Sequence, residues 1–170
     1  MRSIHYSVAM SLDGYVAGPN EEIDWIVMDP EIDFEAMYKR FDTALMGRKT
    51  YDWMRRHGEK PGPLQSILVS PSATPEDYPG ITILGSDAIE RIADLKQAPG
   101  KDIWLFGGGK LFRSLAQAGL VDFVEVGIMP VMIGDGIPLL PSPGPRVNLR
   151  LQAHRTYASG IVMLNYEVLH

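Results

Sequence analysis

The chain of 170 residues has no cysteine, so it can form no disulfide, offer no thiol nucleophile and hold no metal through thiolate ligands. It also lacks a surplus of basic residues, because 16 Lys and Arg face 21 Asp and Glu and the formal net charge is -5. Nucleic acids and anionic membrane surfaces are therefore not expected as partners.

Long apolar runs are missing as well. No run approaches the roughly 18 residues that span a bilayer, and the first residues, "MRSIHYSVAMSLDG", contain no unbroken apolar segment of the kind found in a signal peptide. We therefore expect a cytoplasmic protein. The four histidines, His5, His57, His154 and His170, are too dispersed for any common metal-binding spacing, so no metal is predicted.

Short apolar segments alternate along the chain with segments of helical period. This alternation is typical of an α/β fold. With 45% hydrophobic residues the chain is long enough to bury a core, and residues 1–170 are predicted to form one domain. The Pro- and Gly-rich stretches "HGEKPGP" and "GIPLLPSPGP" are predicted to be loops inside this domain rather than linkers.

About eight strands and four helices are expected. The strands are predicted at residues 4–10, 43–46, 66–69, 81–84, 103–106 and 123–130, followed by a hairpin of residues 149–157 and 161–169. The helices are predicted at residues 33–41, 49–57, 87–97 and 109–118. In the third helix, Asp87 followed three positions later by Glu90 has the spacing of a capping pair.

The stretch "LFGGGKLF", residues 105–112, places three glycines between an apolar strand and a helical segment. It fits neither a Walker A loop, which needs Ser or Thr at Leu111, nor the Rossmann fingerprint, which needs a glycine at Phe112. What remains is a turn without Cβ atoms before a helix N-terminus, whose free N–H groups and dipole attract anions. A purely structural strand-to-helix turn explains the glycines equally well.

A second stretch, "LMGRKTYDW" at residues 45–53, repeats this arrangement with Arg48, Lys49 and Thr50 at the helix start. A guanidinium beside a helix N-terminus suits a dianionic phosphate, so the two turns together could hold two phosphate groups. The alternative is that both cations are solvated surface charges. In "ILVSPS", Ser70 stands just past a strand end and offers a further donor, or is an ordinary turn serine.

Five segments in this order resemble the dihydrofolate reductase-like superfamily, and most closely the C-terminal reductase domain of the riboflavin-biosynthesis protein RibD. They are "VAMSLDGYVAG", "DTALMGRKTYDW", "SILVS", "DIWLFGGGKLFRSL" and "VGIMPVMIGDGIPLLP". The resemblance implies a mostly parallel, doubly wound sheet of eight strands with helices on both faces, closed by the C-terminal antiparallel hairpin. It also implies that the cofactor is NADPH.

By position, the resemblance assigns the cofactor phosphates to the two glycine turns, the nicotinamide to the end of the first strand and the following loop, and the adenine to "ILGSD". The residues so assigned are Ala9, Val16, Gly47, Arg48, Lys49, Thr50, Ser70, Leu84, Gly107, Gly108, Gly109, Lys110, Leu111 and Phe112. Positive charge at Arg48 and Lys49 would favour NADPH over NADH, because only NADPH carries a 2'-phosphate.

The sequence contains fewer clear motifs for substrate binding than for cofactor binding. The resemblance places Asp13 near the nicotinamide, although an Asp-Gly pair is also typical of a simple turn. The carboxylate that assists protonation is assigned to Asp33, beside Phe34, and the alternative is a helix N-terminal acid favoured by the dipole. Trp25, Phe34 and Tyr51 are candidates for the wall of a flat pocket, or are ordinary core residues.

The resemblance thus implies an oxidoreductase that transfers hydride from NADPH to a C=N or C=O group of a small, planar heterocyclic substrate. Dihydrofolate and the riboflavin precursor 5-amino-6-(5-phosphoribosylamino)uracil remain alternative substrates, and a non-catalytic NADPH-binding module remains an alternative function. Because relatives commonly form homodimers and the C-terminal strands present apolar edges, a homodimer is expected.

Overall fold

The computed structural model describes residues 1–59 and 62–170. The predicted loop "HGEKPGP" includes residues 60 and 61, which lie outside the described part. In the rest of the chain, eight strands form one sheet in the order β5-β4-β3-β6-β1-β7-β10-β9. Their bounds are β1 (Ile4–Ser11), β3 (Phe41–Gly47), β4 (Gln65–Val69), β5 (Thr82–Leu84), β6 (Asp102–Gly107), β7 (Phe123–Met129), β9 (Asn148–Thr156) and β10 (Val162–Leu169).

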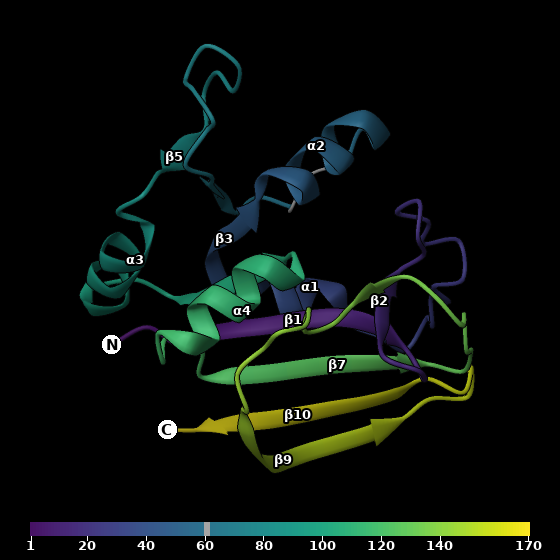
Figure 1. Cartoon of the computed structure of the whole chain (residues 1–170). Coiled ribbons are helices and arrows are strands. Elements are labelled where there is room, and N and C mark those ends of the chain that lie inside the picture. The colour runs from purple at the N-terminus through teal and green to yellow at the C-terminus, as the bar shows by residue number, and fades with distance from the viewer. Residues whose placement is uncertain (60–61) are drawn as a thin grey trace.

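In this sheet, the strands from β5 to β7 all pair in parallel, and the C-terminal β10 and β9 are antiparallel to their neighbours. Parallel neighbours need crossover connections. Most of these connections contain a helix, namely α1 (Phe34–Lys39), α2 (Arg48–His57), α3 (Ala88–Gln97) or α4 (Gly109–Gln117), whereas residues 70–81 join β4 to β5 without one. The predicted α/β fold, with its mostly parallel eight-stranded sheet and C-terminal hairpin, is confirmed (Figure 1).

Each face of the sheet has its own apolar core. On one face, Ile4 and Tyr6 of β1 pack with Ile92 of α3 and with Phe112 and Leu115 of α4. On the other face, Phe41 and Trp104 pack with Met54 of α2, and Met37 and Tyr38 of α1 lie against them. Helices therefore cover both faces of the sheet. Successive side chains of a strand point to opposite faces, so a buried parallel sheet needs helices on both sides to cover its apolar side chains.

The structure differs from the predicted elements in details that short-range sequence signals do not determine. A second sheet of two short strands, β2 (Tyr15–Ala17) and β8 (Ile137–Pro138), was not predicted. The capping prediction for α3 is wrong in part, because Asp87 is the N-cap residue but its side chain makes no capping hydrogen bond. Its carboxylate instead lies 3.7 Å from Arg91 in the next turn.

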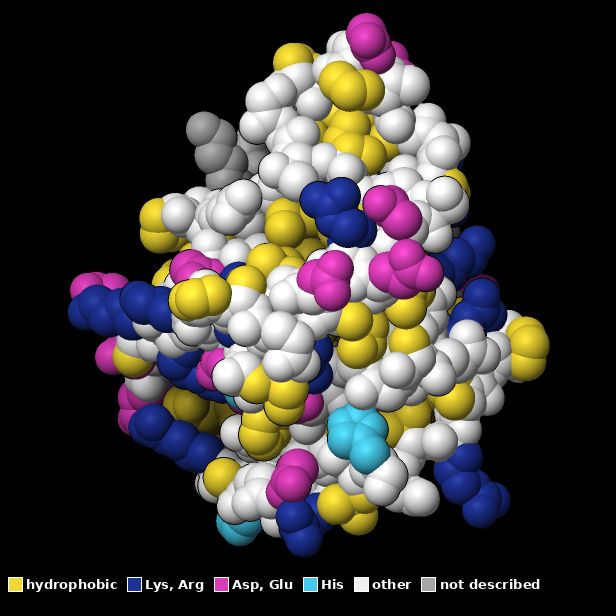
Figure 2. Space-filling view, turned by 90° about the vertical axis from the view of Figure 1, so that its left-hand side faces the viewer, with side chains coloured by type: hydrophobic (Ala, Val, Ile, Leu, Met, Phe, Trp, Pro, Cys, Tyr) yellow, Lys and Arg dark blue, Asp and Glu magenta, His cyan; other side chains and the backbone are white. Residues whose placement is uncertain are grey.

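The surface carries both charges. On the face shown in Figure 2, Lys and Arg side chains are interspersed with Asp and Glu, and hydrophobic side chains lie between them. No helix in the described part of the chain is long and apolar enough to cross a membrane.

The order of the central strands positions the candidate site. Because β3 and β6 are parallel neighbours, both end at the same edge of the sheet, and α2 and α4 both begin there. Two glycine turns that are some 60 residues apart in the sequence are thereby brought together, as the numbering of Gly47 and Gly107 shows.

Candidate functional site

The N-termini of α2 and α4 lie side by side. Gly47 is the N-cap residue of α2 and Gly108 that of α4, and neither helix has a side-chain cap. A Cβ atom placed on Gly47 would lie 3.9 Å from the backbone nitrogen of Gly108. The unpaired N–H groups of two helix termini therefore meet at one edge of the sheet.

The charges at these two helix starts are those that an anion needs. The first turns of α1 and α3 contain Glu35 and Glu90, whereas the first turns of α2 and α4 contain no acidic residue. Arg48, Lys49 and Lys110 stand there instead and are exposed. The positive ends of two helix dipoles are thus reinforced by three cations rather than neutralised.

The glycines of the second turn are close to other parts of the chain. A Cβ atom on Gly109 would lie 2.8 Å from Cδ of Pro141 and 3.0 Å from the carbonyl oxygen of Pro138. Gly107 has a φ of 152°, and Oγ1 of Thr50 would be 3.2 Å from a Cβ atom on Gly108. These contacts explain why the turn excludes side chains, and they place Thr50 of α2 against the glycines before α4.

Leu111 and Phe112 stabilise this turn through backbone hydrogen bonds and packing. Their backbone N–H groups donate to the carbonyl oxygen of Gly108 at 2.9 and 3.1 Å, and the Phe112 ring is buried and stacked on Tyr6 at 4.1 Å between centroids. Gly109 and Lys110 therefore offer the N–H groups that remain available to a ligand. Direct contact of Leu111 and Phe112 with a cofactor stays a prediction.

A hydroxyl cluster lies beside Arg48. Arg48 Nη1 donates to Oγ of Ser72 at 3.2 Å, and the Ser72 hydroxyl lies 3.4 Å from Oγ of the buried Ser70. The Ser70 backbone N–H donates to the carbonyl oxygen of Leu84 at 2.9 Å, so the ends of β4 and β5 fix the cluster. Ser72 was not predicted, although the spacing "SPS" after a strand could have pointed to it.

The two residues predicted to hold the nicotinamide lie further along the sheet. Ala9 is half-buried in β1 opposite Gly127 of β7. Val16 is half-buried in β2, the strand of the small second sheet. Their contact with a cofactor stays a prediction.

Asp13 ties two loops together. Its carboxylate accepts hydrogen bonds from the Ser11 hydroxyl at 2.6 Å and from the backbone N–H groups of Ile133 and Gly134 at 3.2 and 2.8 Å. The Ser11 hydrogen bond is the main reason that the pKa of this carboxyl is lowered. These bonds join the β1–β2 turn to the loop before β8, a role that the structure supports whether or not Asp13 also contacts a substrate.

Asp33 is exposed and caps α1. Its Oδ1 accepts from the Ala36 backbone N–H at 2.8 Å, which is the contact of an N-cap residue. Phe34, the first helical residue, is half-buried. The catalytic role of Asp33 stays a prediction.

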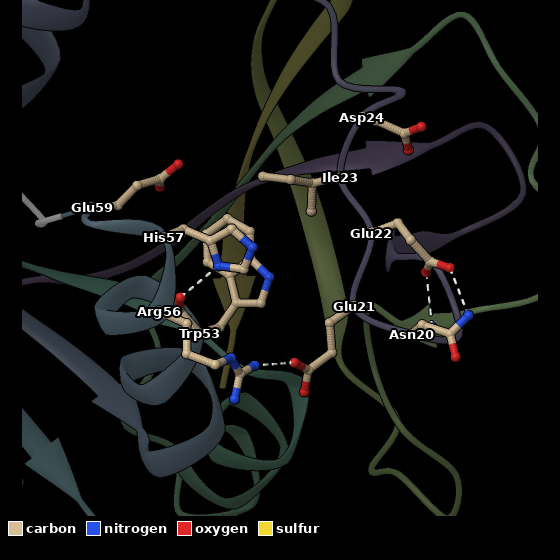
Figure 3. A pocket seen from close by; sticks show the side chains of 9 residues that line it. All are labelled: Asn20, Glu21, Glu22, Ile23, Asp24, Trp53, Arg56, His57 and Glu59. Carbon is tan, nitrogen blue, oxygen red and sulfur yellow. Dashed lines mark hydrogen bonds and ion pairs between the residues drawn. The ribbon is translucent and has the colours of Figure 1, made fainter.

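An open cleft of about 580 Å³ separates the segment before α1 from the outer side of α2. The rings of Trp53 and His57 stack in it at 4.2 Å between centroids, and Figure 3 shows Ile23 across the cavity from them. Arg56 donates to Glu21 at 2.6 Å, which joins the two sides. The cleft was not predicted, although Trp53, Arg56 and His57 share a helix face by their spacing of three and four.

This cleft is not lined by the residues predicted to contact the substrate, namely Asp13, Trp25, Phe34 and Tyr51. Tyr51 lines a second cavity of about 620 Å³ on another side of α2. Its ring meets that of Tyr78 edge-on, with 5.6 Å between the ring centroids. Trp25 is half-buried, and its indole N–H donates to the carbonyl oxygen of Glu22 at 3.2 Å. Their roles as substrate contacts stay predictions.

A buried carboxylate on β7, Glu125, was also not predicted. It accepts from Arg40 Nη2 at 2.6 Å and from the Ser7 hydroxyl at 2.6 Å, and it lies 3.0 Å from His5 Nδ1. Burial raises its pKa, but the hydrogen bonds from His5, Arg40 and Ser7 outweigh burial and hold the pKa at about 2. Glu125 is therefore an ionised anchor between α1 and the sheet, not a proton donor at neutral pH.

Comparison with known proteins agrees with this architecture. Residues 2–163 match the model of the RibD C-terminal domain. The uncharacterized protein YyaP of Bacillus subtilis (strain 168) is 36% identical over 183 residues, with 97% of this chain and 94% of that protein covered.

Solved structures show the same fold. A putative riboflavin biosynthesis protein from Shewanella sp. PV-4 superposes with a TM-score of 0.86 at 22% identity, over 100% of both chains. A dihydrofolate reductase from Enterococcus faecalis, complexed with NADP(H) and RAB-propyl, gives a TM-score of 0.71 at 14% identity, over 99% of this chain and 97% of the other. The fold is therefore dihydrofolate reductase-like, and the chain belongs to the RibD C-terminal domain family.

Proposed function

We propose that this protein is an NADPH-dependent reductase that transfers hydride to a C=N or C=O group of a small, planar heterocyclic substrate. One observation carries the proposal: the uncapped N-termini of α2 and α4 lie side by side, with cations and no acidic residue in their first turns. Two adjacent anion sites suit a ligand with two separated phosphate groups, as a phosphorylated dinucleotide has.

The candidate phosphate-binding residues fall into two groups, one for each phosphate site. The N–H groups of Gly109 and Lys110 would hold the pyrophosphate, while Arg48, Ser70 and Ser72 would hold the 2'-phosphate. The Enterococcus faecalis dihydrofolate reductase, whose fold this chain shares, is complexed with NADP(H). When bound, the cofactor would supply hydride. The chain's part would be to orient the cofactor and to present the substrate.

The cleft beside α2 is our candidate for the substrate entrance. Trp53 and His57 offer a flat surface for a planar ring. The charged residues that line the cleft are mostly acidic, namely Glu21, Glu22, Asp24 and Glu59 against Arg56. Such a lining disfavours a substrate that bears a phosphate there, so we favour an uncharged or cationic heterocycle over the phosphorylated riboflavin precursor.

A reductase and a non-catalytic NADPH-binding module make different predictions in one experiment. Purified protein is titrated with NADPH and with NADH, and the fluorescence of the reduced nicotinamide is followed. A reductase and a non-catalytic NADPH-binding module both prefer NADPH, but only the reductase oxidises bound NADPH when dihydrofolate, the riboflavin precursor or other planar imines and carbonyl compounds are added. Binding of neither dinucleotide would overturn the proposed cofactor.

The same titration on an Arg48→Ala variant tests whether Arg48 binds the 2'-phosphate. The substitution removes a charge-assisted contact that only NADPH can make, so we expect NADPH binding to weaken by about 1.5 to 3 kcal/mol and NADH binding to change little. Arg91→Ala is the matched control, because Arg91 is exposed on α3 and its partner is Asp87. Equal losses for both cofactors would remove Arg48 from the 2'-phosphate site.

We also propose that the protein is a homodimer. Every residue of β9 is exposed, including Leu149 and Leu151, and β9 is the last strand of the sheet. A second copy that covers this strand would remove both an open sheet edge and an apolar surface from water.

A further inference from the structure

A buried tyrosine fastens the loop that carries the serines of the proposed 2'-phosphate site. Tyr78 lies between β4 and β5 and is 8% exposed. Its hydroxyl donates to Oδ1 of Asp52 at 3.0 Å and lies 3.3 Å from Oδ2 of the same carboxylate. Asp52 belongs to α2, the helix that begins at Arg48.

Other contacts fasten the same loop to the same helix. Arg55 Nη1 donates to the carbonyl oxygen of Asp77 at 3.3 Å, and the Arg55 guanidinium lies 5.9 Å from the centre of the Tyr78 ring. Arg48 reaches the loop at Ser72. Three successive turns of α2 thus hold the loop, and Tyr78 is its buried anchor.

The position of Asp52 on α2 gives this hydrogen bond a second consequence. Asp52 follows Arg48 by four residues, and an Arg and an Asp at this spacing lie on the same face of a helix, within reach of an ion pair. In the structure Asp52 accepts from Tyr78, while Arg48 donates to Ser72. The carboxylate is held by the tyrosine, and the guanidinium remains directed at the serine cluster.

The electrostatics of Tyr78 agree with this arrangement. Burial, followed by the hydrogen bond to Asp52 and the negative charge of Asp52, raises the pKa of the Tyr78 hydroxyl, whereas the positive charge of Arg48 opposes the shift. The phenol therefore stays protonated at neutral pH and remains a donor to the carboxylate. The three groups form one coupled set at the start of α2.

We infer that Tyr78 is a specificity-determining residue: by binding Asp52 it keeps that carboxylate from pairing with Arg48, and so leaves Arg48 available to a 2'-phosphate. This inference rests on the proposed function, because it assigns to Tyr78 and Asp52 the discrimination between NADPH and NADH. Neither residue needs to touch the cofactor. Tyr78 and Asp52 are positioning residues that act through Arg48.

Tyr78→Phe tests the inference, since it removes the hydroxyl and keeps the ring. Asp52 then becomes free to pair with Arg48 or to repel the phosphate, and we expect NADPH to bind about 3- to 10-fold more weakly, as a competing ion pair and one nearby charge would produce. The NADH dissociation constant should stay within about twofold of the wild-type value. Tyr157→Phe, the same chemical change in the turn before β10, should alter neither constant.

The double variant separates charge from loop geometry. Asp52→Asn alone removes the competing carboxylate, so NADPH should bind as well as to the wild type or more tightly. Tyr78→Phe combined with Asp52→Asn should restore most of the lost NADPH affinity, a rescue that a purely structural role of the hydroxyl would not produce.

The outcomes are distinct. A double variant no better than Tyr78→Phe, an Asp52→Asn variant that loses NADPH affinity, or a Tyr78→Phe variant with the wild-type NADPH to NADH ratio would each overturn the inference. A wild-type protein that binds neither dinucleotide, or binds both equally, would overturn the proposed cofactor first, and the assignment of Tyr78 with it.

Discussion

Single residues in this protein have roles that depend on the contacts around them more than on their chemical type. Asp33, Asp13 and Glu125 are all carboxylates, yet one caps a helix, one joins two loops and one is buried among donors. Asp33 is exposed and Asp13 is half-buried, whereas Glu125 is buried. Substitutions that preserve shape can therefore separate structural roles from chemical ones.

Asp33→Asn is such a substitution. Asparagine caps a helix as well as aspartate does, so the variant should keep the thermal stability of the wild type while losing the carboxyl group. If Asp33 assists protonation of the substrate, turnover should fall, with the NADPH dissociation constant nearly unchanged. Steady-state kinetics and a cofactor titration on the same preparation measure both.

The comparison with Asp33→Ala completes this test. Alanine also removes the cap and should cost about 1 kcal/mol of stability. Unchanged turnover in Asp33→Asn would mean that the proton comes from another source, most simply from water.

Glu125 makes a pH-dependent contribution to stability. Its pKa is lowered from 4.5 to about 2 in the folded protein, so its ionised form favours folding. The contribution is complete above about pH 4.5 and is lost as the pH falls toward 2. The shift corresponds to about 3 kcal/mol at neutral pH.

Glu125→Gln should remove this contribution. Urea unfolding at pH 7 should show a loss of about 3 kcal/mol relative to the wild type, and the difference should shrink on acidification below pH 4.5. Glu167→Gln, at the half-buried partner of the exposed Arg150, serves as the control and should lose less than about 1 kcal/mol. A difference for Glu125→Gln that stays constant down to pH 3 would contradict the anchoring role of its charge.

At the scale of elements, the glycine turns before α2 and α4 differ in how tightly they are packed. A Cβ atom on Gly109 would meet Pro138 and Pro141 at the end of β8 and in the loop after it, whereas a Cβ atom on Gly47 would have, among the described residues, only the Gly108 nitrogen within 4 Å. The loop of residues 138–141 is thereby fixed over the start of α4. The same small substitution at both glycines can test this difference in packing.

Gly109→Ala should be destabilising, because its Cβ atom would lie 2.8 Å from Pro141 Cδ. We expect a loss of about 1 to 3 kcal/mol, as for other overpacked positions, measured by thermal or urea unfolding. Gly47→Ala is the matched control, since the residue has a φ of -77° and its Cβ atom would be 3.9 Å from the nearest atom. Equal losses in both variants would show that packing against the prolines is not the cause.

At the scale of the whole molecule, the sheet is covered unevenly. Helices pack on both faces of the central strands β3 and β6. At the other end of the sheet, β9 is the last strand (Figure 1) and is exposed along its whole length. An open edge with exposed leucines promotes association of sheets. The proposed dimer gives this edge a partner of the same sequence.

Leu151→Lys tests the dimer. Leu151 is 49% exposed in the single chain, so a lysine there should leave the folded monomer intact and should shift the mass measured by analytical ultracentrifugation from dimer to monomer. Lys39→Ala on α1, a change on another face, should leave the mass unchanged. A wild-type protein that sediments as a monomer at micromolar concentration would contradict the proposal.

Much of the architecture was determined by the sequence alone. Alternation of apolar strands with helical segments predicted the α/β sheet, because burial on both faces requires near-continuous apolar strands and crossover helices. The helix at residues 49–57, which the structure shows at Arg48–His57, and the two glycine turns were also predicted, since glycine, cations and apolar period act over only a few residues. The order of five motifs then indicated the family, which the match over residues 2–163 confirmed.

Contacts between distant segments were decided only by the tertiary structure. The bond between Tyr78 and Asp52 spans 26 residues and that between Glu125 and Arg40 spans 85, and no local pattern encodes such pairs. The cleft beside Trp53 likewise depends on how the segment around Glu21 crosses α2. Short-range periodicity fixes which face of an element is apolar, but the partners of a polar side chain depend on how the elements pack, and packing is a property of the whole chain.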